Sequence, residues 1–368
     1  MKKFIIKSLI TNLIILFIVI TLNFFLPRMI FDDPCEPYYI GVPEDAVLLR
    51  AQIREEYGFD KPIIVQYFIY LKNIFTFNFG TSYIYKDSII NVMFSKMPWS
   101  VFINLTVLLL TVFFGILIGA KCALNRGKFK DRLLLKLNSI TSSIPSFWIA
   151  LVAVLVFGFI LPIFPYSGAM SPGYSLNVNW VVFIIIYSII IISTIVLYLI
   201  FKKGIICFLL PILGLYIAII FSISALDLVD IIYHSILPIC VVLIGSIISY
   251  SLSIRNYMIA VVNEDYIFTA RAKGLPKRRI LYHHILKNSM LPLVTNLGLS
   301  FVGLFSGSVL IEKIFSWPGM GNLMVEANNL GDFKLVQALL LFYAVLTILA
   351  NFITDILYHK LDPRVSVM

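Results

Sequence analysis

The residues best suited to chemistry lie in one polar stretch, Asn263 to Met290, between two long apolar runs. Asn263-Glu264-Asp265 suits a helix N-terminus, where the helix dipole favours acidic side chains. The segment Tyr266 to Lys273 continues as a helix, with Ala270 and Ala272 as a small-residue surface, and Gly274 suits its C-terminus. We therefore expect a helix–Gly–helix hairpin whose chemistry is the docking of a partner protein.

A second helical segment is expected to begin at Pro276 and to carry Lys277, Arg278 and Arg279. A small, basic face of this kind fits a groove on another chain. The alternative is a solvated loop whose positive charge only marks the cytoplasmic side of a membrane. The pattern alone leaves both interpretations open.

The motifs of ATP binding and metal catalysis are missing from the sequence. It contains no G-x-x-x-x-G-K-[ST] loop, no H-E-x-x-H and no paired-Cys motif. The adjacent His283 and His284 point to different sides of a helix, so we expect no metal site there. If ATP drives this protein, another chain binds it.

The composition indicates the element type that positions the loop. The 368 residues are 60% hydrophobic and 13% charged, with a mean hydropathy of +0.96. A soluble domain needs more polar surface than this, so the sequence predicts an all-α, polytopic membrane protein. The net charge of +10 falls in short clusters between apolar runs, which indicates membrane orientation and not nucleic-acid binding.

Apolar runs of about 20 residues predict about eight transmembrane helices. They cover roughly 8–26, 99–121, 138–162, 180–200, 205–224, 235–257, 293–311 and 335–357. The charge bias places both termini and the loop 258–292 in the cytoplasm and the mixed-charge segment 27–97 outside. We expect short helices at 43–57 and 62–75 within that segment. The predicted organisation is an N-terminal transmembrane helix (1–26), an extracytoplasmic segment (27–97) and a membrane core (98–368).

Small and polar residues within the spans suggest how the helices pack. Gly115 with Gly119, and Gly303 with Gly307, have the small-xxx-small spacing that lets two helices approach closely. Ser142, Ser143 and Pro145 predict a kink near the start of the third span, and a polar cavity is the alternative. Polar residues that are candidates for lining a pore are Asn104, Thr106, Ser142, Ser143, Asn296, Ser300 and Ser306.

The span interiors hold almost no ionisable residues, which argues against a transporter driven by its own ion or proton relay. Arg255 and Asp355 lie near the ends of their spans, where we expect their side chains to snorkel toward water. A stand-alone channel or secondary transporter remains the competing class.

Ordered sequence blocks along the chain carry a family pattern. They are Tyr57 to Pro62, Gln66-Tyr67, Phe79 to Ser82, Phe164 to Gly168, Glu264 to Ile267, Thr269 to Leu275, His284, Lys287-Asn288, Leu291-Pro292, Ser306 to Ser308, Glu312, Phe315 to Gly321, Asn351, Asp355, Tyr358 and Asp362 to Arg364. These blocks resemble the permease subunits of ATP-binding-cassette (ABC) importers, and most closely the oligopeptide/dipeptide/nickel permease family, B-type subunit. The polar loop resembles that family's cytoplasmic "EAA" loop. The resemblance covers nearly the whole chain apart from about 170–230.

Two departures from the family pattern stand out. The Glu-Ala-Ala triplet of the general permease consensus reads Phe268-Thr269-Ala270 here, and Gly274 lies farther from Leu291-Pro292, as is usual in the peptide subclass. The family also has six spans, so the resemblance implies an inserted helix pair at about 180–224. Because such a pair enters and leaves on one side, it preserves the core topology.

The resemblance implies a type I ABC importer permease fold and a transport subunit that is not an enzyme. Its partners would be a homologous second permease, two ATP-binding subunits carrying ATP and magnesium, an extracytoplasmic binding protein and membrane lipid. The chain itself would hold no cofactor or metal. Di- or oligopeptide import is the expected function, with nickel or a metal chelate as the alternative.

By transfer from the family, one set of residues couples to the ATPases: Glu264, Asp265, Ala270, Arg271, Ala272, Lys273, Gly274 and Leu275. Trp317-Pro318-Gly319 resembles an external re-entrant turn that gates the pore mouth. An interfacial Trp anchor is the alternative interpretation of Trp317.

Overall fold

A computed structural model of the chain describes residues 2–30, 47–56, 59–173, 214, 217–218, 225–276, 279–289, 300 and 302–361. The described part is helical, with an isolated β-bridge between Thr81 and Ser88. The chain divides into two compact units, which are described separately. The first comprises Met1–Met97, Asn256–Val309 and Gly319–Met368, and the second comprises Pro98–Arg255 and Leu310–Pro318.

Helices long and apolar enough to cross a membrane confirm the polytopic, all-α prediction. The described residues contain four such helices, or five if one bent pair is counted as a span. They correspond to the predicted spans at 8–26, 99–121, 138–162 (the bent pair), 235–257 and 335–357. The predicted spans 180–200 and 205–224, and the first part of 293–311, lie almost entirely outside the described residues, so the total of eight stays a prediction.

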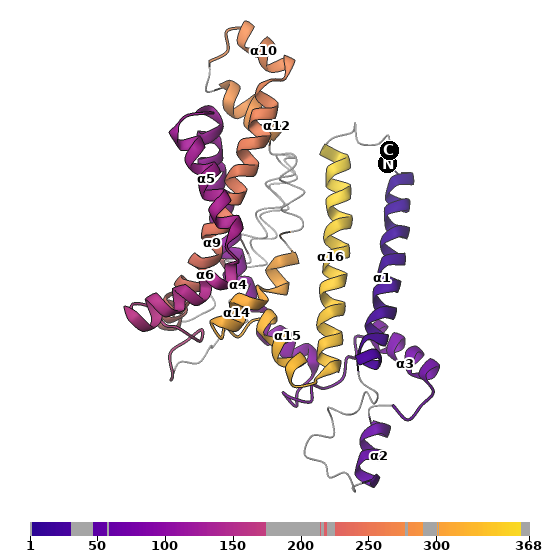
Figure 1. The fold of residues 1–368 in the computed structure, drawn as a ribbon. Coiled ribbons are helices and arrows are strands. Elements are labelled where there is room, and N and C mark those ends of the chain that lie inside the picture. Colours follow the sequence, from indigo (N-terminus) through magenta and orange to yellow (C-terminus); the bar gives the residue numbers. More distant parts are fainter. Residues whose placement is uncertain are drawn as a thin grey trace. The chain divides into compact units, whose positions relative to one another are not determined.

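In the first unit, α1 (Lys2–Ile30) lies beside α16 (Phe333–Leu361) (Figure 1). Amides join the two helices: Asn23 Nδ2 donates to Gln337 O at 2.8 Å, and Gln337 Nε2 donates to Asn23 O at 2.9 Å. Side-chain amides serve well here because lipid offers no competing hydrogen bonds.

The predicted short helices of segment 27–97 are present in the described part. They are α2 (Val47–Glu56) and α3 (Ile63–Phe75). Tyr67 and Tyr70 of α3 pack their rings against Phe24 of α1, which is 1% exposed. The face of α3 that carries these two tyrosines therefore packs on the parent chain.

A further core in the first unit joins the start of α4 (Ile89–Leu124) to α15 (Met320–Asn329) and α16. Ile89, Val92 and Met93 recur at helical spacing and are buried there, so α4 begins ten residues before the predicted span. The preceding loop is fixed by Ser82 Oγ, which donates to the buried Asp332 carboxylate at 2.5 Å. Tyr85 Oη donates to Glu326 at 2.8 Å. Burial is the main cause that raises the pKa of Tyr85, and this hydrogen bond is the second.

In the second unit, α4 packs closely against α9 (Ala225–Val262) at the first predicted glycine pair. A Cβ at Gly119 would lie 2.5 Å from Ser251 O and 2.7 Å from Ile254 Cβ. One at Gly115 would lie 2.5 Å from the Tyr250 ring. The predicted close packing is thus confirmed at Gly115 and Gly119, because only a hydrogen fits in these positions.

The same expectation stays a prediction for Gly303 and Gly307. A Cβ on Gly303 would meet no atom within 4 Å among the described residues. Gly307 has φ +74°, a left-handed conformation that interrupts the helix before α14 (Val309–Ile314). A helix break therefore lies at Gly307, the second glycine of the pair.

The predicted kink in the third span is confirmed. Helix α5 (Phe129–Ser143) and the continuous helix Ser146–Ile160 are bent by 87° at a break of two residues. The latter comprises α6 (Ser146–Ala153) and the π-helical η2 (Val154–Ile160). Pro145 lacks an N–H and forces Ile144 into an extended conformation (ψ 120°), which ends α5.

Candidate functional site

The polar loop folds as the predicted helix–Gly–helix hairpin, with α10 (Asp265–Ala272) as its first helix. Glu264, and not Asn263, occupies the N-cap position in an extended conformation, without a side-chain cap. Its carbonyl accepts from Ile267 N at 2.9 Å. Asp265 lies in the first turn, where its charge favours the positive end of the helix dipole.

The turn after α10 is a Schellman motif centred on Gly274. Gly274 N donates to Arg271 O at 2.9 Å, and Leu275 N donates to Ala270 O at 3.3 Å. Gly274 has φ +70°, a conformation that side chains with a Cβ rarely adopt. The predicted role of Gly274 in the turn is confirmed, and the turn fixes the direction of the chain after α10.

The second helix of the hairpin consists of η3 (Ile280–Leu286) followed by α12 (Lys287–Ser289). It begins near Pro276, whose carbonyl accepts from Arg279 N at 2.9 Å. The two helices are in contact, and Asn288 Nδ2 donates to Tyr266 Oη at 2.8 Å across the hairpin. α10 is therefore attached to its own chain by side chains as well as by the turn.

The two faces of α10 differ in exposure. Ile267 is fully buried and Ala270 is 5% exposed, whereas Phe268 is 75% exposed. The predicted small-residue surface is therefore wrong for Ala270, which faces its own chain, because its small side chain allows α10 to pack closely there. Of the predicted coupling set, Leu275 is half-buried and the remaining members are exposed: Glu264, Asp265, Arg271, Ala272, Lys273 and Gly274.

The outward surface of the hairpin carries an exposed aromatic residue and charges. Phe268 is 75% exposed, and Tyr266, on another side of α10, is 40% exposed. The basic residues Arg271, Lys273 and Arg279 are exposed on the same hairpin, as are the acidic Glu264 and Asp265. An exposed Phe amid cations has the composition of a protein-docking site, in which an aromatic anchor contributes most of the affinity and charges steer the approach.

The polar pore candidates are satisfied by their own helices. Asn104 Nδ2 donates to Ser100 O at 2.9 Å and Thr106 Oγ1 donates to Phe102 O at 2.6 Å. Ser142 and Ser143 bond the carbonyls of Asn138 and Ser139, four residues earlier. In a helix, Ser and Thr hydroxyls commonly form such bonds with the carbonyl four residues earlier.

The remaining pore candidates lie in the other compact unit or outside the described residues. Ser300 and Ser306 are half-buried and belong to the first compact unit, whereas Asn104 and Ser142 belong to the second. Asn296 lies outside the described residues. The lining of a pore is therefore still a prediction for this set.

The predicted turn at Trp317-Pro318-Gly319 is built around a buried side chain. Trp317 is fully buried, its Nε1 donates to Trp99 O at 3.0 Å, and its ring stacks on Phe102. The turn itself is closed by Trp317 N, which donates to Glu312 O at 2.8 Å. Pro318 is half-buried, and Gly319 is the buried N-cap of α15. Trp317 thus anchors the turn inside the second unit and is not exposed as an interfacial anchor would be.

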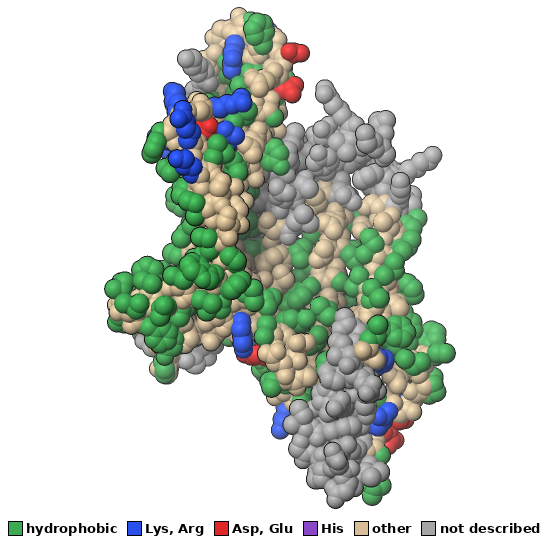
Figure 2. Space-filling model, viewed as in Figure 1, with side chains coloured by type: hydrophobic (Ala, Val, Ile, Leu, Met, Phe, Trp, Pro, Cys, Tyr) green, Lys and Arg blue, Asp and Glu red, His purple; other side chains and the backbone are tan. Residues whose placement is uncertain are grey.

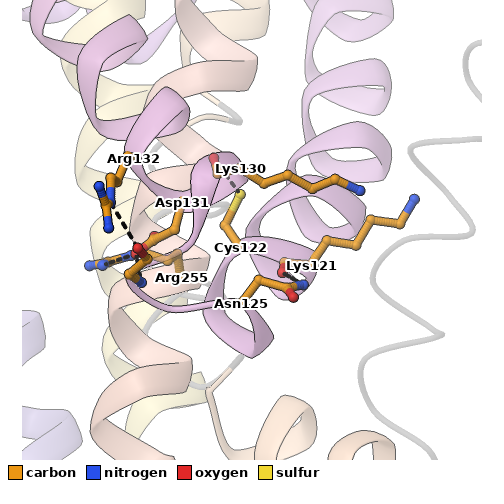
Figure 3. Close-up of polar contacts among 8 residues, drawn as sticks. Lys121, Cys122, Asn125, Lys130, Asp131, Arg132 and Arg255 are labelled. Carbon is orange, nitrogen blue, oxygen red and sulfur yellow. Dashed lines mark hydrogen bonds and ion pairs between the residues drawn. The ribbon is translucent and has the colours of Figure 1, made fainter.

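Two buried polar pairs were missed by sequence reasoning. Ser100 Oγ donates to the Glu312 carboxylate at 2.7 Å beside the Trp317 turn. Asp131 accepts two hydrogen bonds from Arg255, at 2.7 and 2.9 Å, and one from Gly127 N at 2.8 Å (Figure 3). The expectation that Arg255 snorkels to water was therefore wrong.

The described helices define a multi-pass membrane component. Comparison with known families is consistent with this class. Residues 204–367 match the binding-protein-dependent transport system inner membrane component family, and residues 1–104 match the N-terminal domain of that type of membrane component.

Individual relatives extend the match over the whole chain. The oligopeptide transport system permease protein OppB of Haemophilus influenzae is 32% identical over 366 residues, covering 99% of both chains. The dipeptide transport system permease protein DppB of Lactococcus lactis is 32% identical over 368 residues, covering 100% of both. The di/tripeptide transport system permease protein DppB of Pseudomonas aeruginosa is 31% identical, covering 94% of this chain and 93% of its own.

This chain belongs to the family of binding-protein-dependent transport system inner membrane components. It is a multi-pass permease subunit of an ABC importer and not an enzyme, so the resemblance of its sequence blocks is confirmed. The competing class of a stand-alone channel or secondary transporter is excluded by this membership.

Proposed function

We propose that the chain forms one half of a pore that imports di- or oligopeptides. The names of its relatives, which span nearly its full length, support a peptide substrate over nickel or a metal chelate. The other half of the pore would be a homologous permease, and an extracytoplasmic binding protein would deliver the peptide. A largely apolar path is compatible with peptides of varied side chains, because a pore selects little when the binding protein selects first.

The proposed topology places both termini and the hairpin 258–292 in the cytoplasm, with 27–97 outside and an inserted helix pair at 180–224. The basic residues of the hairpin and of the loop between α4 and α5 support this orientation. ATP and magnesium would be held by two separate subunits that bind at the cytoplasmic face.

The observation that carries the proposal is the two-sided character of α10. Its inner face, with Ile267 and Ala270, is buried in its own chain, and its outer face presents Phe268 at 75% exposure. The Tyr266–Asn288 bond and the Gly274 turn hold the helix in one orientation. Such a helix transmits displacement as a rigid body, as coupling to an ATPase requires.

The outer-face residues then have distinct roles. Phe268 would insert into a groove of the ATPase, while Arg271 and Lys273 would pair with acidic groups around it. Glu264 and Asp265 would hold the start of the helix, and Gly274 with Leu275 would fix its end. Ala272 would let the partner approach closely.

The test is peptide uptake by the full transporter with Phe268→Ala. Truncating an aromatic hot spot costs about 2 kcal/mol or more of binding, so we expect uptake and peptide-stimulated ATP hydrolysis to fall at least tenfold. The variant should insert into the membrane normally, because Phe268 makes little contact with its own chain. Phe75→Ala is the matched control, since Phe75 is 77% exposed on α3. Normal uptake by Phe268→Ala would refute the docking role.

A further inference from the structure

A second charged surface lies on the hairpin formed by the end of α4 and the start of α5, residues 121–137. It carries six cations, all exposed: Lys121, Arg126, Lys128, Lys130, Arg132 and Lys136. Figure 2 shows Lys and Arg side chains gathered over this end of α5. The docking of an ATP-binding subunit on α10, as proposed above, does not use this hairpin.

The acidic residue of this hairpin is removed from its surface. Asp131 is 1% exposed, because its carboxylate is turned inward to Arg255 and Gly127 N (Figure 3). The two oxygens accept at 2.7 and 2.9 Å from Arg255, so the charge of Asp131 is balanced within the chain. The surface of residues 121–137 therefore presents positive charge without an exposed carboxylate.

Apolar side chains run beside these cations along α5. Phe129 is 77% exposed, Leu133 41%, Leu137 38% and Ile140 56%. At 100° per residue, they form one stripe, and Lys128, Arg132 and Lys136, spaced four residues apart, form a parallel stripe next to it. Both stripes lie opposite the helix face that buries Asp131 and Leu134.

We propose that this paired stripe binds an anionic phospholipid of the surrounding bilayer. The cations would bind the phosphate and acidic headgroup, and the Phe129 stripe would pack against the first part of the acyl chains. Interfacial helices use this combination of basic and apolar faces at a membrane surface. The long stems of Lys and Arg let the charges reach headgroups while their methylenes cover apolar surface.

Continuity with the membrane span favours lipid over an acidic protein as the occupant. The apolar stripe continues to Ile140, within a helix that is part of a candidate span. One molecule with a charged head and an apolar tail therefore satisfies both stripes at once. A protein groove can hold an aromatic side chain amid cations, as proposed for Phe268, but the stripe that begins at Phe129 continues along a candidate span, where lipid surrounds an apolar helix.

Native mass spectrometry of the full chain, released from non-ionic detergent, tests this assignment. The chain would be titrated with phosphatidylglycerol and, separately, with phosphatidylcholine of the same acyl chains. We expect phosphatidylglycerol to bind at least tenfold more tightly. The triple variant Lys128→Gln/Arg132→Gln/Lys136→Gln should lower phosphatidylglycerol affinity roughly tenfold or more, because cations near an anionic lipid each add to the attraction.

The matched control is Lys61→Gln/Lys72→Gln/Lys313→Gln, which removes the same charge from exposed positions elsewhere. It should keep the wild-type preference. Equal binding of the two lipids by the wild-type chain would overturn the proposal, even if the triple variant fails to fold. Unchanged lipid preference in a triple variant that loses its ATP-binding partners would also overturn it, and would assign the stripe to a protein.

Discussion

Replacing Gly119 by Ala should destabilise the packing of α4 against α9. The added Cβ would lie 2.5 Å from Ser251 O and 2.7 Å from Ile254 Cβ. Ser251 O is a backbone atom of α9, and Ile254 Cβ is bonded directly to that backbone. Neither atom can move by a change of side-chain rotamer, so the clash is relieved only if the two helices separate. Overpacking of this kind costs about 1–3 kcal/mol, whereas Gly→Ala in a helix gains about 1 kcal/mol.

Gly245→Ala in α9 isolates the steric part of this effect. A Cβ there would meet no atom within 4 Å among the described residues, so only the stability gained from the higher helix propensity of Ala remains. The two variants should therefore differ in unfolding free energy by roughly 1–3 kcal/mol, the overpacking cost alone.

Thermal unfolding of the full chain in detergent, followed by tryptophan fluorescence, measures this difference. Gly245→Ala should melt at or above the wild-type temperature, and Gly119→Ala clearly below Gly245→Ala. If the two variants melt together, the contact between α4 and α9 is not as close as the structure shows, and the packing argument fails.

Two further perturbations probe buried polar groups. Asp131→Ala should cost about 3–5 kcal/mol of stability, because it leaves the partly buried Arg255 without its carboxylate partner; a loss below 1 kcal/mol in chemical unfolding would contradict a buried ion pair. For Tyr85, the raised pKa means that the folded chain keeps a proton that the unfolded chain releases above about pH 10. The free energy of unfolding should therefore fall as pH rises above that value. In unfolding experiments at pH 8 to 11, Tyr85→Phe should make this fall shallower. An unchanged slope of unfolding free energy against pH would argue against the bond to Glu326.

Local sequence signals predicted much of the fold. Apolar runs located the described spans, and Pro145 located the 87° bend, because lipid and a missing N–H act on the chain directly. Gly274 likewise predicted the turn after α10, since its φ of +70° strongly favours glycine. Each of these depends on a residue and its immediate neighbours.

The rest of the fold depends on contacts between residues far apart in the sequence, which local patterns do not show. Asp131 and Arg255 are 124 residues apart, and nothing in either neighbourhood shows that they meet. Ala270 was assigned to an outward surface by residue size alone, and the structure buries it against its own chain. Gly303 and Gly307 match a packing motif, but their spacing alone does not show whether a second helix packs against them.

The central claim, that the outer face of α10 docks an ATP-hydrolysing subunit, is tested most directly by photo-crosslinking. A benzophenone side chain placed at position 268 of the full chain, in cells that carry its partner subunits, should form a covalent adduct with an ATP-binding subunit. The same group at position 75 should not. Adducts from position 268 only to lipid, to this chain, or to an extracytoplasmic protein would contradict the account.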